Sequence, residues 1–153
     1  MKEIEINSNE EAELIKTLEK RDDAEAKRML RFLNMSDLSR TEGSPIYELV
    51  QRISAIPRFA DFDVLSVPEI VRADLSFDLF NFPPDHPARS RSDTYYVDDE
   101  NIMRTHTTVM WQYHLDLPEV KEKISTRQVV GALSYGKVYR KDEIDRNHMN
   151  VFH

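Results

Sequence analysis

The first quarter of the chain is dominated by helical periodicity. Between residues 9 and 35, apolar residues recur every three or four positions among mixed acidic and basic ones, as in amphipathic helices with a solvated charged face. Ser8 and Glu11 have the spacing of a capping box, in which each side chain accepts a hydrogen bond from the other's backbone amide. We therefore expect one long helix or two shorter ones, after a short extended or irregular lead over residues 1–7.

Ser44 and Pro45 predict the start of a further helix, because serine is a preferred N-cap and proline is tolerated in the first turn. Pro57 ends it. We expect its buried face to consist of the apolar residues at helical spacing, which are Ile46, Leu49, Val50, Ile53 and Ile56. The polar stretch before this helix contains Gly43 and predicts a boundary between a helical N-terminal appendage (residues 1–43) and the main domain (residues 44–153).

From residue 62 onward the pattern changes to short β-type runs bounded by turn residues. These runs cover residues 62–71, 94–97, 102–105 and 128–140. Pro68 predicts an edge strand or a bulge in the first run, and Gly131 and Gly136 predict bulges or close backbone approaches in the last. Helical spacing returns in residues 107–115 and 118–124. This order predicts an α+β fold with a largely antiparallel sheet and flanking helices.

Composition narrows the class of protein. Hydrophobic residues make up 40% and charged residues 32% of the 153-residue chain, as in a soluble globular protein. No apolar run approaches the roughly 20 residues that span a bilayer, and the N-terminus lacks the apolar region of a signal peptide. The absence of cysteine excludes disulfides and thiolate chemistry and suits a cytoplasmic location. None of the histidines has His-Glu-x-x-His spacing, so we expect no metal held by the protein itself.

The stretch with the most chemistry is GKVYRKDEIDRNHMNVFH, residues 136–153. It predicts a strand, a polar loop and the start of a returning strand. The hairpin offers an arginine, carboxylates, a histidine and an aromatic ring, which suit a phosphate, a base edge and a base plane. The residues therefore indicate a nucleotide site.

This hairpin resembles motif 2 of the class II aminoacyl-tRNA synthetases, in the form found in the phenylalanyl-tRNA synthetase alpha subunit. Two further blocks occur in the same order as in that family: NFPPDHPAR at residues 81–89, followed by DTYY at residues 93–96, and MRTHTT at residues 103–108. The block at residues 81–89 would form part of the active-site wall. The helix after Ser44 and the strand that ends at Pro68 resemble motif 1, which builds the dimer interface in the family.

The resemblance implies roles for four residues of the hairpin. Arg140 would hold the α-phosphate of ATP and the carboxylate of the amino acid as they react. Asp142 would lie near the adenine, His148 would approach the outer phosphates, and Phe152 would stack on the adenine. Each residue also has an ordinary structural interpretation: a surface arginine, a turn carboxylate, an exposed histidine and a core phenylalanine.

The same resemblance places His106 and Thr108 in the amino-acid pocket. A histidine and a hydroxyl two positions apart, just after a strand, could both point into one pocket and bind an amino group and a carboxylate. The family often has serine at the position of Thr108, and threonine keeps the hydroxyl. The alternative for His106 is a structural histidine.

The implied function is that of a phenylalanine–tRNA ligase alpha subunit, which activates phenylalanine with ATP and transfers it to tRNA(Phe). Mg²⁺ would come with the ATP, and a beta subunit would be the partner. Because the net charge is −7, this chain alone is a poor candidate for tight tRNA binding. In the family, a glutamine, a glutamate and the motif 3 arginine follow the matched part. We therefore expect an N-terminal part of the enzyme, inactive by itself. The alternative is a synthetase-derived module for dimerisation or small-ligand binding, without ligase activity.

Overall fold

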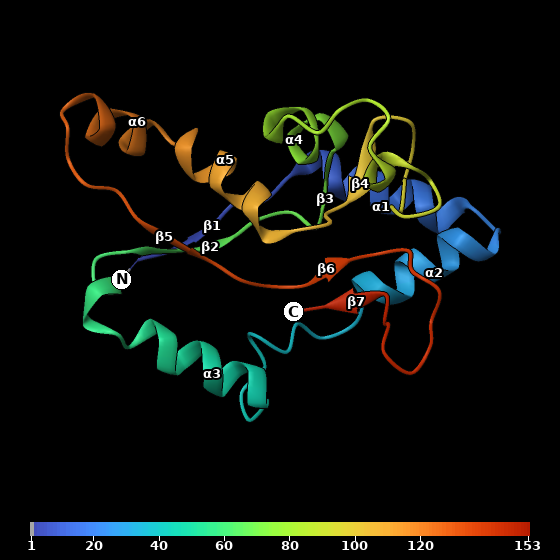
Figure 1. Cartoon of the computed structure of the whole chain (residues 1–153), viewed down its shortest axis with the longest axis horizontal. Helices are drawn as coiled ribbons and strands as arrows, with labels where there is room; N and C mark the ends of the chain where they lie inside the picture. The colour runs from blue at the N-terminus through green and yellow to red at the C-terminus, as the bar shows by residue number, and fades with distance from the viewer. Residues whose placement is uncertain (1) are drawn as a thin grey trace.

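A three-stranded parallel sheet and two antiparallel strand pairs form the framework of the computed structural model, which describes residues 2–153 (Figure 1). The sheet has the order β1 (Glu3–Glu5), β2 (Asp63–Ser66), β5 (Ala132–Ser134). The antiparallel pairs are β3 (Ile70–Arg72) with β4 (Asn101–Met103), and β6 (Val138–Tyr139) with β7 (Val151–Phe152). The expected mixture of helices and strands is confirmed.

The expected antiparallel pairing holds only for the two smaller pairs. In the largest sheet, β2 runs parallel to both of its neighbours, with Leu65 opposite Ile4 and Ser134. Parallel neighbours need long crossover connections, and helical segments lie between β1 and β2 and between β2 and β5. The alternation of side chains within a strand is the same for either direction, so the sequence pattern could not reveal this.

Six α-helices and four 3₁₀ turns connect these strands in the part of the chain that the structure describes. The helices are α1 (Asn9–Lys20), α2 (Ala24–Leu33), α3 (Pro45–Ser54), α4 (Ala73–Ser76), α5 (Met110–Leu115) and α6 (Pro118–Ser125). The turns are η1 (Pro57–Phe59), η2 (Asp78–Phe80), η3 (Pro87–Arg89) and η4 (Thr107–Val109). None of the helices within residues 2–153 is both long and apolar enough to cross a bilayer.

The capping box at the start of α1 is confirmed for one of its two halves. The Ser8 hydroxyl accepts a hydrogen bond from the Glu11 amide at 3.1 Å. The Glu11 carboxylate instead accepts bonds from the amides of Glu69 and Ile70 at 2.6 and 2.8 Å. Burial raises the pKa of Glu11, and the two amides oppose that shift. The Glu11 side chain, which the local spacing predicted to cap the helix, therefore makes a tertiary contact instead.

Both predicted long strands are interrupted. The run over residues 62–71 divides into β2 and β3 around Pro68, which has no N–H for a ladder. The run over residues 128–140 divides into β5 and β6 near Gly136, whose φ is +149°. A Cβ at Gly136 would lie 2.8 Å from an Arg104 guanidinium nitrogen, so the predicted close backbone approach is confirmed there.

The N-terminal helices pack directly on the β-strands. One buried cluster joins α1 and α2 to β3, β4, β6 and β7 through the following residues: Leu18, Ala26, Met29, Phe32, Ile70, Tyr95, Val97, Met103, Tyr139 and Val151. Ile4 of β1 belongs to a second cluster, together with Leu65, Phe77 and Met110. The boundary at Gly43 stays a prediction, but residues on both sides of it share one core.

The expected buried face of α3 is wrong. No residue of the helix is buried, and Leu49, Ile53 and the following Ile56 are 56%, 41% and 44% exposed. The side of α3 that faces the body of the molecule is polar: Tyr47, Gln51 and Ser54 line a hollow of about 370 Å³. In Figure 1, α3 lies at the margin of the molecule, apart from the other helices.

The last turn of α5 exposes an apolar residue and buries a polar one. Leu115 is 41% exposed, whereas Val109 and Met110 at the start of the helix are buried. His114 is buried instead, and its Nε2 lies 2.9 Å from the Asp63 carboxylate. The Asp63 carboxylate gives the ring a hydrogen-bonding partner inside the protein, so burial of this polar group is compensated.

Candidate active site

Arg140 and His106 line the same cavity, which has a volume of about 330 Å³. Thr105 and His106 follow β4 after one intervening residue, Arg104, and Arg140 follows β6 directly. The remaining wall comes from the Pro-rich block and the segment after it: Phe82, His86, Pro87, Ala88, Asp93 and Thr94. The structure thus brings together residues from all three blocks that the sequence singled out.

Backbone hydrogen bonds hold these segments beside one another. The Tyr139 amide donates to the Arg104 carbonyl at 3.0 Å, which sets β6 against the end of β4. The Lys141 amide donates to the Asp93 carbonyl at 2.9 Å. On the far side of the hairpin, the Arg140 amide donates to the Asn150 carbonyl at 3.0 Å. The backbone of Arg140 is therefore held between two neighbouring segments while its side chain extends away from them.

The Arg140 side chain is 62% exposed, and its Nε lies 3.4 Å from the Asp142 carboxylate. An exposed ion pair of this kind contributes little stability. The guanidinium can therefore exchange this contact for a stronger, bidentate bond to a phosphate or carboxylate. Asp142 is close enough to orient the arginine but does not line the cavity.

His106 lines the cavity, and one of its ring nitrogens has no hydrogen-bond partner among residues 2–153. Its Nε2 lies 3.1 Å from the Ser76 carbonyl, and a carbonyl only accepts, so in the neutral ring Nε2 carries the proton. Nδ1 is then an acceptor, and it is buried without a hydrogen-bond partner among residues 2–153. The Phe80 ring meets the imidazole edge-on at 5.2 Å and fixes its plane. A donor such as an amino group would satisfy this nitrogen.

The other predicted site residues do not line this cavity. Thr108 is exposed in η4. His148 is exposed, and its Nδ1 lies 2.9 Å from the Asp145 carboxylate. Bonds from the Asn147 amide and from His148 hold the pKa of Asp145 below its ordinary value. Phe152 is half-buried in β7, opposite Val138.

Sequence reasoning did not identify Asn150 as a residue that shapes the hairpin. Asn150 is buried, and its side-chain amide donates to the carbonyls of Arg140 and Asp142 at 2.9 and 2.8 Å. It therefore closes the base of the loop next to the arginine. Its position between a polar loop and a returning strand was the available signal, because asparagine commonly bonds nearby backbone in turns.

Two buried cations beneath the hairpin were also not predicted. Arg104 donates to the carbonyls of Lys137 and Val67 at 2.7 and 2.9 Å, and burial lowers its pKa. The Lys137 ammonium lies 3.1 Å from the Glu69 carboxylate. The Tyr139 hydroxyl also donates to Glu69, and burial together with this carboxylate raises the pKa of Tyr139. Buried charges of this kind require such partners.

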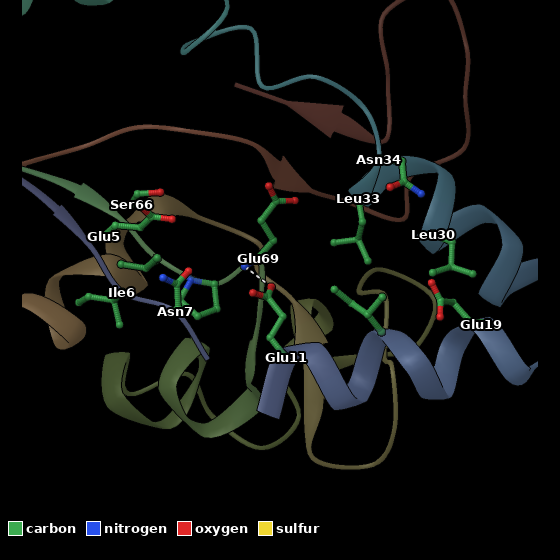
Figure 2. Close-up of a pocket in the computed structure, with 13 residues that line it drawn as sticks. Glu5, Ile6, Asn7, Glu11, Glu19, Leu30, Leu33, Asn34, Ser66 and Glu69 are labelled. Carbon is green, nitrogen blue, oxygen red and sulfur yellow. Dashed lines mark hydrogen bonds between the residues drawn. The ribbon is translucent and has the colours of Figure 1, made fainter. Parts of the chain in front are cut away.

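Another hollow, of about 310 Å³, lies between α1, α2 and the segment after β2 (Figure 2). Its wall carries the carboxylates of Glu5, Glu11, Glu19 and Glu69. Carboxylates repel phosphate, so the cavity at Arg140 is the better candidate for a nucleotide. Among residues 2–153, no group of three His, Cys, Asp or Glu side chains is arranged to hold a metal ion.

Comparison with known proteins identifies the family of the chain. The family model for the tRNA synthetases class II core domain (F) matches residues 32–153. The phenylalanine–tRNA ligase alpha subunit of Malacoplasma penetrans is 36% identical over 109 residues, which cover 71% of this chain and 30% of that protein. The Aquifex aeolicus alpha subunit is 36% identical over 118 residues, or 75% of this chain and 32% of the relative.

A longer match is to the alpha subunit of Clostridium acetobutylicum, which is 29% identical over 155 residues, covering 97% of this chain and 43% of the relative. The chain thus spans less than half the length of these curated relatives. The resemblance to phenylalanyl-tRNA synthetase alpha subunits that the three sequence blocks indicated is confirmed. With the family model matching most of its residues, the chain belongs to the class II aminoacyl-tRNA synthetase core-domain family.

Proposed function

We propose that this chain forms the ATP- and phenylalanine-binding part of a phenylalanine–tRNA ligase alpha subunit. The observation that carries the proposal is the convergence of Arg140 and His106 on one cavity. The Arg140 guanidinium suits both the α-phosphate of ATP and the carboxylate of phenylalanine, which must come together in the reaction. The unpartnered Nδ1 of His106 suits the amino group of phenylalanine. The named relatives are phenylalanine–tRNA ligase alpha subunits, which supports phenylalanine as the substrate.

In the proposed reaction, a carboxylate oxygen of phenylalanine attacks the α-phosphorus of ATP. The bond from this phosphorus to the bridging oxygen breaks, so phenylalanyl-adenylate forms and pyrophosphate leaves. A hydroxyl of the tRNA then attacks the activated carbonyl and releases AMP. No protein nucleophile is needed, and Arg140 would contribute by aligning the two anions and offsetting their charge.

The roles of the other predicted residues remain part of the proposal. Asp142 would lie near the adenine, Phe152 would stack on it, His148 would reach the outer phosphates, and Thr108 would join His106 at the amino acid. These residues would have to approach the cavity from the surrounding hairpin and η4. Mg²⁺ would arrive bound to the ATP phosphates, since it usually keeps waters and substrate oxygens as ligands.

The proposed partners are a beta subunit and tRNA(Phe), in the cytoplasm, where the two would meet. The formal net charge of −7 argues that other parts of the assembly contribute most of the tRNA contacts. A second candidate function is a non-catalytic dimerisation or small-ligand-binding module. The exposed apolar face of α3 favours an association role, which is compatible with either candidate.

Calorimetric titration of ATP·Mg²⁺ into the chain tests the proposal. We expect Arg140→Ala to weaken binding by about tenfold or more, because a charge-assisted hydrogen bond is lost. Arg146→Ala is the matched control: it removes an exposed arginine from the same loop and should leave the affinity unchanged. Equal effects of the two substitutions, or no ATP binding by the unmodified chain, would contradict the proposal. We also expect no phenylalanine-dependent pyrophosphate exchange from these 153 residues alone.

A further inference from the structure

Alternate residues around β6 make contact with a single helix, α2. Lys137 is buried, and its ammonium donates to the carbonyls of Phe32, Leu33 and Met35 at 3.2, 2.8 and 2.7 Å. The Tyr139 ring stacks on Phe32, with ring centroids 6.5 Å apart and an interplanar angle of 21°. Figure 1 shows α2 beside β6 and β7.

Lys141 makes the third contact at the opposite end of the helix. Its ammonium bonds to the carboxylate of Glu25, in the first turn of α2. Residues 137, 139 and 141 thus turn toward α2. Because side chains alternate along a strand, Arg140 turns the other way, into the cavity that it shares with His106.

Lys137 bonds to the end of α2 that suits its charge, whereas Lys141 bonds to a carboxylate at the opposite end. The last carbonyls of a helix lack partners within the helix and carry the negative end of its dipole, and Lys137 satisfies three carbonyls there or just beyond. Glu69 offsets the buried charge of Lys137 at 3.1 Å. At the other end, Glu25 provides a negative group for Lys141.

Helix α2 and the segment from Lys137 to Lys141 have similar lengths. A helix of ten residues is about 15 Å long at its usual rise, and four steps of extended chain cover about 13 Å. Lys137 and Lys141 are four positions apart, so their spacing is similar to the distance between the two ends of α2. A second connection extends to α1, because Glu11 holds the amide of Glu69 (Figure 2) while the Glu69 carboxylate meets Lys137.

We propose that α2 positions Arg140 by fixing the chain on both sides of it. Lys137, Lys141 and Glu25 are then positioning residues for the active site. This inference rests on the proposed function for its effect on ATP, but the contacts exist without a ligand. It gives the N-terminal helices a role in the site, although they contribute no residue to the cavity at Arg140.

The substitution that tests this role of α2 is Glu25→Gln. The loss of a negative charge and the loss of the contact with Lys141 should change the affinity for ATP in opposite directions. Removing a carboxylate near the site would strengthen ATP binding if only charge mattered. If α2 positions Arg140, ATP binding should weaken about threefold to tenfold, since Lys141 loses its anchor. Asp22→Asn is the matched control: it removes the same charge from an exposed pair with Lys27, just before α2, and should not weaken ATP binding.

Hydrogen exchange without ATP separates this inference from the proposed function. Glu25→Gln should speed exchange of the amides of Tyr139, Arg140 and Lys141 severalfold relative to Asp22→Asn, while α3 amides stay unchanged. If the unmodified chain binds no ATP, the proposed function fails and this exchange result still decides whether α2 positions Arg140. Lys141→Arg, which keeps the charge, should retain the protection that Lys141→Gln loses.

Two results would overturn the inference. One is unaltered exchange of the three hairpin amides in Glu25→Gln. The other is faster exchange throughout the chain with a lower melting temperature, because that would show general destabilisation rather than a local loss of positioning.

Discussion

Helices α2 and α3 are matched in length and pattern but differ in what covers them. Each has ten residues, an apolar stripe and a side-chain N-cap, Asp23 for α2 and Ser44 for α3. Helix α2 buries Ala26, Met29 and Phe32, whereas α3 buries none of its residues. An amphipathic pattern therefore shows that a helix has a face to cover, but not whether its own chain covers it.

The surfaces beneath the two helices explain the difference. Under α2 lie the apolar side chains of β3, β4, β6 and β7, and its ends meet Lys137 and Lys141. Under α3 lies a polar surface in which Arg40 stacks on Tyr135 at 4.8 Å. The apolar stripe of α3 consequently points outward. The resemblance to motif 1 would place this helix in a dimer interface, and an exposed apolar stripe is suited to such a role.

The largest expected difference between the helices is in core stability. Phe32→Ala in α2 should lower the free energy of unfolding by about 3–5 kcal/mol, because it opens a cavity between Tyr95 and Tyr139. Leu49→Ala in α3 should change it by less than about 0.5 kcal/mol in the monomer, because Leu49 is 56% exposed. Urea denaturation at low protein concentration measures both. Similar losses from the two substitutions would show that α3 is part of the core.

The next largest expected effect is on self-association of the chain through α3. If the outer face of α3 binds a second copy of the chain, Ile53→Glu should weaken self-association about tenfold or more, because it places a charge in an apolar contact. Gln51→Glu adds the same charge to the side of α3 that lines the polar hollow and serves as the control. Sedimentation equilibrium measures both. A chain that stays monomeric at all concentrations, or equal effects of the two variants, would argue against this interface.

The smallest expected difference between the two helices is in how the stability contributed by their N-caps depends on pH. Bonds from Arg21 and from the Ala26 amide lower the pKa of Asp23 from 3.8 to about 2. A lowered pKa stabilises the fold above the ordinary value, and that stability is lost as pH falls toward 2. Asp23→Asn should therefore be less stable than the unmodified chain at about pH 5, and the difference should shrink as the pH approaches about 2.

Ser44→Ala, at the matching cap of α3, provides the comparison. The Ser44 hydroxyl accepts a hydrogen bond from the Ile46 amide at 3.2 Å, and serine does not titrate in this range. Its loss should cost about 1 kcal/mol at most, independent of pH. Urea denaturation at several pH values measures both caps. A constant difference between Asp23→Asn and the unmodified chain over this range would contradict the assigned role of Asp23.

Local signals predicted most of the longer helices and the final hairpin, but residues 94–97, predicted as a strand, form only an isolated bridge between Tyr96 and Ile102. Ser44 and Pro45 start α3 where expected, and α6 begins at Pro118 as predicted and ends one residue beyond the predicted range. The hairpin of residues 136–153 was predicted as a strand, a loop and a returning strand, and β6 and β7 occupy those positions. These features depend on interactions between residues close in sequence, such as caps and proline geometry, so the sequence contains the information directly.

The candidate site was predictable in part. Arg140 and His106 were selected from the sequence, and the structure places both on one cavity. Lys137 was not selected, because a lysine in a polar stretch usually belongs to the solvent-exposed surface. Only the approach of the α2 carbonyls and Glu69 makes its burial possible. Partners this far away along the chain leave no local pattern.

By itself, the sequence determined where helices and turns begin, which side chains share a face, and which family the three blocks resemble. The tertiary structure alone decided the parallel direction of β1 and β5 beside β2, the outward face of α3 and the contacts of α2 with both ends of β6. The physical reason is the range of the forces involved. Caps, proline and glycine act within a few residues, whereas burial and charge pairing depend on which distant surfaces meet when the chain folds.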